Sequence, residues 1–270
     1  AHPSNQKNME TLTSYGNKVL PVGEGFLASG LEGKGRMLEP ETIVTHLIDF
    51  FNPNLPLKNK KILITAGPTY EAIDPVRFIG NHASGKMGFA LAEVAAQLGA
   101  EVTLISGPTS EKIEYPTIKV EKVVSAKAMF EAVKNSYSQA DIAIAAAAVA
   151  DYKPEVEAEQ KIKKKTDQVT LNLVPTQDIL AYMGANKKKQ YLLGFALETE
   201  NELDNAKGKL ERKNLDGIVL NSLQDSGAGF SVSTNKITFI HADKSIQTFP
   251  LQSKYACAQA IFDQILPHDT

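Results

Sequence analysis

The sequence has a single cysteine among its 270 residues, and this scarcity excludes two common ways of stabilising a chain. Cys257 alone forms neither an intrachain disulfide nor a cysteine-based zinc site. Its neighbours Tyr255, Ala256 and Ala258 indicate a buried core thiol rather than a nucleophile. A lone reduced thiol is typical of the cytoplasm, and we expect the protein to work there.

Long hydrophobic runs are missing as well. The longest run, residues 142–150, ends at Asp151 and is far shorter than the about 20 apolar residues that cross a bilayer. This excludes a membrane-spanning helix. The chain starts at Ala1 without a methionine and without the basic and apolar segments of a signal peptide, and we interpret it as a piece of a longer protein.

An excess of charge of either sign is also absent. Lys and Arg total 29 and Asp and Glu total 31, so the net charge is −2. This balance disfavours a protein that binds nucleic acids or anionic membranes. The hydrophobic content of 43% is enough for a sizeable core, which excludes a disordered chain.

The composition divides the chain near residue 57. The first part is rich in glycine, as loops are. Its residues 40–51 nevertheless show helical spacing of apolar side chains, with Pro40 suited to the first turn. Prolines and asparagines at 52–56 are typical of a linker. The sequence therefore predicts two domains, residues 1–57 and residues 58–270.

Short apolar runs alternate with helical spacing after this boundary, as in parallel strands joined by helical crossovers. The expected strands are 61–66, 101–106, 118–120, 141–146, 169–174, 191–195 and 217–220, and the expected helices are 87–98, 126–136, 177–183, 200–213 and 252–266. Residues 235–241 and 245–249 predict an antiparallel hairpin. The fold class is therefore α/β, with a doubly wound, Rossmann-like, mostly parallel sheet and helices on both faces. Such sheets bind ligands beyond the carboxyl ends of their strands, here at the loops starting at Gly67, Ser106, Ala147 and Ala196.

The loop 67–86 is long enough to indicate function. Its Gly80-x4-Gly85-Lys86 imitates a phosphate-binding P-loop, but Met87 stands where Ser or Thr would hold magnesium. The loop also lacks the G-x-G-x-x-G pattern of a nicotinamide dinucleotide site. Ser84 and Gly85 open a helix whose free amides suit an anion, although Ser84 is equally well explained as a plain N-cap.

Two further features have a functional and a structural interpretation. The tiny side chains of residues 145–150 let a ligand approach the backbone, and Asp151 just beyond them is either a ligand-binding carboxylate or a cap. The basic run 161–165 is either a solvated face or a site that neutralises phosphate charge. Lys209 and Lys213, four residues apart, share one helix face. The histidines have no metal-ligand spacing, and His82 is the one that we consider for substrate.

The motifs of residues 64–69, 74–79, 81–88, 147–152 and 161–164 occur together and in this order. They closely resemble bacterial phosphopantothenate-cysteine ligase, and the resemblance extends over about residues 58–266. The family joins phosphopantothenate to cysteine through an acyl-cytidylate, converting CTP to CMP and pyrophosphate in coenzyme A biosynthesis. The resemblance implies Mg²⁺ held with the CTP, and a homodimer of the ligase domain.

The resemblance also implies a role for particular residues. Those expected to bind the nucleotide are Asp151, Lys161, Gln177, Asp178, Ile179, Leu180, Phe195, Lys209 and Lys213. Those expected at phosphopantothenate and its acyl intermediate are Arg77, Asn81, His82 and Ala147. Lys161 would act on the phosphates during activation, and Asn81 on the acyl intermediate, so these two are the expected catalytic residues. At Gln177 the family often has proline.

Residues 2–6 and 27–37 resemble the tail and substrate flap of the flavin-dependent phosphopantothenoylcysteine decarboxylase, which bacteria commonly fuse ahead of the ligase. Ser29 stands where many decarboxylases have a proton-donating cysteine, and a hydroxyl is a far weaker acid. FMN is expected only for the flavin-binding body that this sequence lacks. The alternative functions are thus a part of an FMN-dependent decarboxylase and a non-catalytic assembly module.

Overall fold

A computed structural model describes residues 2–26, 32–51, 55–113, 115–164, 168–198, 200–222 and 232–266. The chain forms two compact units, Ala1–Leu55 and Pro56–Thr270. The division falls close to the boundary after residue 57 that the sequence predicts. In the described part of the chain no helix is long and apolar enough to cross a membrane.

The first unit is small. Its elements are α1 (Pro3–Ser14), β1 (Gly23–Phe26), β2 (Glu32–Arg36) and α2 (Pro40–Phe51), with β1 and β2 paired antiparallel. Helix α2 begins at Pro40 as predicted. Helix α1 was not expected from the glycine-rich composition; His2 caps it by accepting a hydrogen bond from the backbone N–H of Ser4. Ser29 lies outside the described residues.

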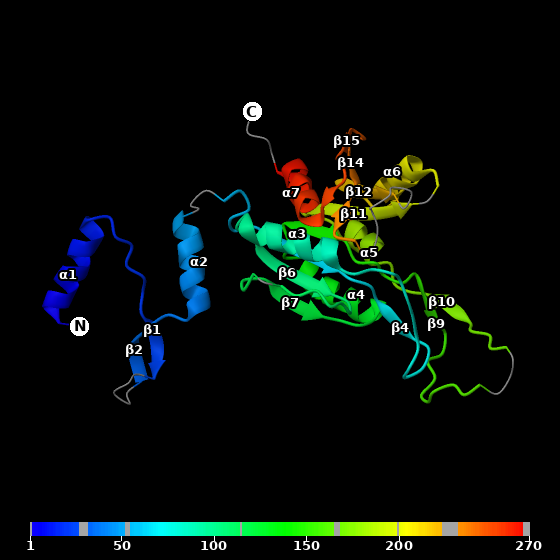
Figure 1. Ribbon diagram of the computed structural model, residues 1–270, viewed down its shortest axis with the longest axis horizontal. Helices are drawn as coiled ribbons and strands as arrows, with labels where there is room; N and C mark the ends of the chain where they lie inside the picture. Colours follow the sequence, from blue (N-terminus) through cyan, green and yellow to red (C-terminus); the bar gives the residue numbers. More distant parts are fainter. Residues whose placement is uncertain are drawn as a thin grey trace. The chain divides into compact units, whose positions relative to one another are not determined.

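The second unit is built on an eight-stranded sheet in the order β15-β14-β12-β11-β8-β3-β6-β7 (Figure 1). Its strands are β3 (Lys61–Ala66), β6 (Glu101–Ser106), β7 (Lys119–Lys122), β8 (Ile142–Ala145), β11 (Tyr191–Glu198), β12 (Gly217–Ser222), β14 (Ile237–His241) and β15 (Ile246–Thr248). The strands from β7 to β12 are parallel, and β14 and β15 add the predicted antiparallel hairpin. The predicted α/β fold is confirmed. After β3 the chain adds β6 and β7 on one side of it, and then β8, β11 and β12 on the other side. The switch point at which doubly wound sheets bind ligands therefore lies between β3 and β8.

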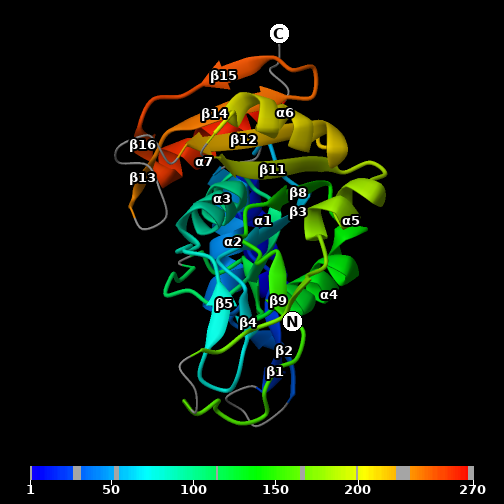
Figure 2. The same ribbon diagram turned by 90° about the vertical axis from the view of Figure 1, so that its right-hand side faces the viewer.

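The two faces of the sheet bury separate cores. Ile62 and Ile64 of β3 face one core, and Leu63 between them faces the other, because successive side chains of a strand alternate. The helices α3 (Lys86–Gln97) and α7 (Lys254–Ile265) cover the first face, and α4 (Ala126–Tyr137), α5 (Ile179–Ala185) and α6 (Glu202–Arg212) cover the second (Figure 2). Cys257 is fully buried in the first core, as predicted.

Short strand pairs stand outside the main sheet. They are β4 (Tyr70–Ala72) with β5 (Phe78–Gly80), β9 (Tyr152–Pro154) with β10 (Leu173–Pro175), and β13 (Thr234–Asn235) with β16 (Gln252–Ser253). We call the β4–β5 hairpin, the β9–β10 pair and the loop 155–164 the arm; β4 and β9 are neighbours in it. Two predictions were wrong here: residues 67–86 are not all loop, and the expected strand 169–174 is the shorter β10. A strand of three residues carries few alternations, and these pairs lack the short connecting turn that marks β14 and β15 as a hairpin.

Two glycines fix the start of α3 against β3. Gly85 precedes the helix with φ of 83°, a left-handed conformation that suits glycine. A Cβ on Gly88 would lie 2.5 Å from the Cβ of Ala66. The first turn of α3 therefore lies directly against the carboxyl end of β3.

Candidate functional site

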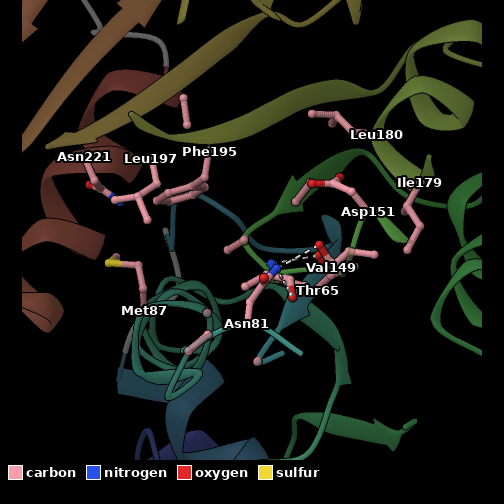
Figure 3. A pocket seen from close by; sticks show the side chains of 18 of the residues that line it. Thr65, Asn81, Met87, Val149, Asp151, Ile179, Leu180, Phe195, Leu197 and Asn221 are labelled. Atoms are coloured by element: carbon pink, nitrogen blue, oxygen red, sulfur yellow. Dashed lines mark hydrogen bonds between the residues drawn. The ribbon is translucent and has the colours of Figure 1, made fainter. Parts of the chain in front are cut away.

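A pocket of about 1060 Å³ opens at the carboxyl ends of β3, β8, β11 and β12, where the sheet has its switch point (Figure 3). The starts of α3 and α5 close two of its sides. The pocket gathers every residue with an expected role except Arg77 and Lys161. The expected residues that line it are Asn81, His82, Ala147, Asp151, Gln177, Asp178, Ile179, Leu180, Phe195, Lys209 and Lys213.

The floor of the pocket is the small-residue segment that follows β8. Threonine hydroxyls hold its backbone: Thr65 Oγ1 accepts from the N–H of Ala147 at 3.3 Å, and Thr69 Oγ1 accepts from Ala150 at 2.9 Å. The N–H of Ala148 donates to the carbonyl of Gly67 at 2.9 Å. The segment is thus fixed from the β3 side, while its alanine side chains leave the pocket open above it.

Asn81 lies beside this floor (Figure 3). Its Nδ2 donates to the carbonyls of Ala148 at 3.3 Å and Val149 at 3.0 Å. The resemblance places Asn81 at the acyl intermediate; in the structure its amide N–H₂ holds the pocket wall, and it shares the Ala148 carbonyl with the N–H of Thr69. The side-chain oxygen of Asn81 is the group that remains for a ligand.

Asp151 is exposed at the pocket. Its backbone carbonyl accepts from the N–H of Thr176 at 2.9 Å, but its carboxylate makes no hydrogen bond to any residue that the structure describes. The interpretation as a helix or turn cap is therefore wrong. A solvated carboxylate at the rim is free to accept hydrogen bonds from the hydroxyl groups of a ligand.

The start of α5 forms the opposite side of the pocket. Asp178 caps the helix, with Oδ1 accepting from the N–H of Ala181 at 2.8 Å and Oδ2 accepting from Lys213 Nζ at 2.5 Å. Burial by itself raises the pKa of Asp178, but the hydrogen bonds from Lys213 and Ala181 outweigh it and hold the pKa below its ordinary value. Asp178 is thus a structural carboxylate that also positions Lys213.

Lys209 is held by the backbone of β11. Its Nζ donates to the carbonyl of Phe195 at 2.8 Å. Burial lowers the pKa of Lys209, and the carboxylates of Glu198, Asp178 and Asp151 oppose that shift. Lys209 lies in the last turn of α6 and Lys213 is its C-cap residue, and both line the pocket.

The structure leaves Arg77 and Lys161 outside the pocket, on the arm. Arg77 donates to the carboxylate of Asp74 and, from Nη2, to the carbonyl of Ile162 at 2.9 Å. Lys161 is exposed, as are Lys163 and Lys164, whereas Lys165 lies outside the described residues.

Two further lysines line the pocket: Lys86, to which the sequence assigned no role beyond an imitation of a P-loop, and Lys254, which it missed. Lys254 is 7% exposed, and burial, together with the nearby charge of Lys86, lowers its pKa. A signal was present, because Lys254 occupies the first turn of α7, where the helix dipole disfavours a cation. Ser84 is not the N-cap of α3, since Gly85 takes that position.

These groups give the pocket a defined chemical character. Lysines and the backbone N–H groups at the start of α3 attract an anion, and the backbone and side chain of Phe195 offer a surface for a flat ring. Among the described residues no three His, Cys, Asp or Glu side chains gather in a way that could hold a metal ion. The pocket therefore suits a ligand that combines phosphate groups, hydroxyl groups and an aromatic ring.

The chain belongs to the family described as DNA/pantothenate metabolism flavoprotein, C-terminal domain, which it matches over residues 57–268. A protein named cysteine/cysteine sulfinic acid decarboxylase, from an unknown prokaryotic organism, is 50% identical over 98% of this chain and 75% of its own length. The coenzyme A biosynthesis bifunctional protein CoaBC of Bacillus subtilis is 44% identical over 98% of this chain and 66% of its own length.

A solved structure gives the same family relationship. The C-terminal domain of a coenzyme A biosynthesis bifunctional protein CoaBC superposes with a TM-score of 0.67 at 42% identity, covering 78% of this chain and 96% of that one. The chain spans about two thirds to three quarters of the length of the two curated relatives.

Proposed function

We propose that the unit Pro56–Thr270 joins phosphopantothenate to cysteine through an acyl-cytidylate. The observation that carries the proposal is the pocket at the switch point of the sheet, which brings Asp151, the start of α5 and the lysines of α6 together. The relatives named as coenzyme A biosynthesis proteins support it, because two of them are 42–44% identical to this chain over the aligned residues.

The proposed reaction has two steps. A carboxylate oxygen of phosphopantothenate attacks the α-phosphorus of CTP, and the bond to the bridging oxygen breaks, so that pyrophosphate leaves. The neutral amine of cysteine then attacks the acyl carbon, loses a proton, and displaces CMP together with the former carboxylate oxygen. Both steps involve anionic groups, and positive charge close to them lowers the barrier.

The residues of the pocket divide between the two ligands in this proposal. Asp151 accepts from the ribose hydroxyls, and Phe195 with the start of α5 (Gln177, Asp178, Ile179 and Leu180) holds the base. Lys209 and Lys213 bind the nucleotide from α6. Asn81, His82 and Ala147 face phosphopantothenate and the acyl intermediate.

We propose that Mg²⁺ arrives with the CTP. The donor set fits an ion held by phosphate oxygens and water, since the described residues form no metal-ligand cluster of their own. Such an ion would neutralise part of the triphosphate charge. FMN belongs to the flavin-binding body expected ahead of residues 1–57, and no described residue is assigned to it.

A homodimer supplies the missing parts of the pocket in this proposal. Arg77 and Lys161 lie on the arm outside their own pocket, and the arm exposes apolar side chains that a second copy would cover: Val76 is 59%, Phe78 51% and Tyr152 55% exposed. The arm of one copy would then bring Arg77 and Lys161 to the pocket of the other. Light scattering that gives the mass of one chain at the concentration of the assay would contradict this arrangement.

The competing function is a part of an FMN-dependent phosphopantothenoylcysteine decarboxylase, which the resemblance of residues 2–6 and 27–37 suggests. It would require a bound flavin, so a purified protein that is yellow would favour it. The second competitor, a non-catalytic assembly module, would bind without turnover. We place all three functions in the cytoplasm, where the buried Cys257 stays reduced.

The experiment that tests the proposal is a coupled assay of pyrophosphate release. The purified chain is given CTP and Mg²⁺ with phosphopantothenate and cysteine, and then with each of these two substrates omitted. We expect sustained release that requires both substrates for turnover. No release under any of these conditions, with the protein shown to be folded, would reject a ligase.

A further inference from the structure

Asp74 occupies the tip of the β4–β5 hairpin and is 2% exposed. Both of its carboxylate oxygens are used. Oδ1 accepts from the backbone N–H groups of Val76 and Arg77, each at 2.9 Å, and so closes the turn. Oδ2 accepts from Arg77 Nε at 3.0 Å, from Arg77 Nη2, and from the backbone N–H of Ile162 at 3.1 Å.

The contact with Ile162 joins two segments that are far apart in the sequence. Ile162 gives its N–H to Asp74, and its carbonyl accepts from Arg77 Nη2 at 2.9 Å. Asp74 and Arg77 thus bind both polar groups of one backbone residue, as a neighbouring strand would. A second link runs from the N–H of Ala158 to the carbonyl of Ile73 at 3.0 Å.

We call the hydrogen bonds of Asp74 and Arg77 to Ile162 the anchor; it lies within the basic run 161–165. Lys161 and Lys163 flank Ile162 and are exposed, while Ile162 itself is half-buried. Without the anchor, an exposed loop of lysines would sample many backbone conformations, and ordering it during the reaction would cost conformational entropy. With the anchor, the backbone from which Lys161 extends is fixed before any ligand binds.

We propose that Asp74 is a positioning residue for the activation step: it holds the loop 155–164 in the register that presents Lys161 to the nucleotide phosphates. The inference rests on the proposed ligase function. A carboxylate is required because every group around Asp74 is a donor; an amide would direct its own N–H₂ toward Arg77 or toward the N–H of Ile162. The hydrogen bonds from Arg77 hold the pKa of Asp74 well below its ordinary value, so it stays ionised across the range in which the enzyme is assayed.

The test is a double-mutant cycle with Asp74→Asn and Lys161→Ala, read as the rate of CTP-dependent pyrophosphate release at saturating substrates. We expect Asp74→Asn to lower the rate at least about tenfold in the natural background and to have no further effect in the Lys161→Ala background, because the two residues act as one unit. A general structural defect would instead lower the rate by the same factor in both backgrounds.

The matched control is Asp141→Asn. Asp141 also binds a backbone N–H, that of Lys61 at 3.0 Å, and a cation, Lys189 at 3.3 Å, but it lies at the amino ends of the strands, away from the pocket. We expect this variant to change the rate of pyrophosphate release by less than about twofold, since surface ion pairs contribute little. A tenfold lower rate in Asp141→Asn would show that the effect of Asp74→Asn is not specific to Asp74.

A second measurement, the rate of cleavage by trypsin, tests without catalysis whether the anchor holds the loop. Trypsin cleavage after Lys161 or Lys163 requires the backbone at Ile162 to leave Asp74 and Arg77, so Asp74→Asn should raise the cleavage rate at these two bonds about tenfold while Asp141→Asn leaves it unchanged. If Asp74→Asn is unfolded at the assay temperature, Arg77→Lys, which keeps the turn and removes the contact with the Ile162 carbonyl, should give the same increase.

The outcomes separate this inference from the proposed function. If trypsin cleavage is unchanged and Asp74→Asn lowers the rate of pyrophosphate release by the same factor in both backgrounds, the role of Asp74 is overturned while the ligase function stands. If the natural protein releases no pyrophosphate, the ligase fails and the role of Lys161 with it, and the cleavage rate then decides whether Asp74 holds the loop.

Discussion

The charged side chains around the pocket differ in how their neighbours hold them. Asp178 and Lys213 bind each other at 2.5 Å, and Lys209 is tied to the carbonyl of Phe195. Asp151 has no such partner among the described residues, and its carboxylate is exposed. A residue that contributes little to stability at a pocket rim is a good test of ligand binding, because its removal leaves the fold intact.

We predict that Asp151→Ala leaves the thermal midpoint unchanged in the absence of ligand and reduces the increase that CTP causes. CTP at a hundred times its Kd stabilises the folded state by about 2.7 kcal/mol, and a weaker binder gains less. Thermal unfolding with and without CTP measures both quantities. An unchanged CTP shift together with a lower midpoint in its absence would mean that Asp151 is a structural residue.

The acid side of the stability profile depends on Asp74. Its pKa is lowered in the folded protein, chiefly by the hydrogen bond from Arg77 and further by backbone N–H groups. A carboxylate with a lowered folded pKa contributes stability above its unfolded pKa, near 4, and that contribution is lost as the pH falls. Asp74→Asn should therefore flatten the loss of stability below about pH 4.

Urea unfolding at a series of pH values measures this effect. The control is Asp263→Asn, which replaces an exposed aspartate on α7; its acid profile should follow that of the natural protein. Identical profiles for the Asp74 variant and the natural protein would show that the carboxylate is not held by its neighbours in solution.

At the scale of elements, the first turn of α3 shows how close packing builds the pocket. Alanine normally stabilises a helix relative to glycine by about 1 kcal/mol. At Gly88 the added Cβ would lie 2.5 Å from Ala66 Cβ and 3.1 Å from Ala66 Cα, so the helix would have to move. We predict that Gly88→Ala destabilises the protein by about 1–3 kcal/mol.

Gly208→Ala in α6 is the matched control. There the added Cβ would meet the end of the flexible Arg212 side chain at 2.8 Å, which swings aside at little cost. This variant should be as stable as the natural protein or more stable, by up to about 1 kcal/mol. Urea unfolding compares the two, and equal effects of the two substitutions would contradict the close contact at Gly88.

The elements also show how far a sequence argument reaches. Strands such as β3 and β8 are continuous apolar runs and helices such as α4 show helical spacing, and the sequence predicts them. The pairs β4–β5 and β9–β10 are too short for a pattern, and what stabilises β4–β5 is the stacking of Tyr70 on Phe78 at 3.8 Å and the buried Asp74. The hydrogen bond between Asp74 and Ile162 joins residues 88 apart in the sequence, and no local pattern predicts it.

At the scale of the molecule, the family motifs name residues that the fold divides between two places. Most of them converge on the pocket, because parallel strands place their carboxyl ends at one edge. Arg77 and Lys161 lie together on the arm instead, through Asp74 and Ile162. Sequence order cannot show this division, since Arg77 and Asn81 are only four residues apart yet belong to the two different places.

The central claim is that a nucleotide is transferred to phosphopantothenate before cysteine attacks. Phosphopantothenate labelled with oxygen-18 in its carboxylate, incubated with the chain, CTP, Mg²⁺ and cysteine, tests it directly by mass spectrometry of the products. An acyl-cytidylate predicts one labelled oxygen in the CMP and none in the pyrophosphate. Label in inorganic phosphate with formation of CDP, or CMP without label, would contradict the account.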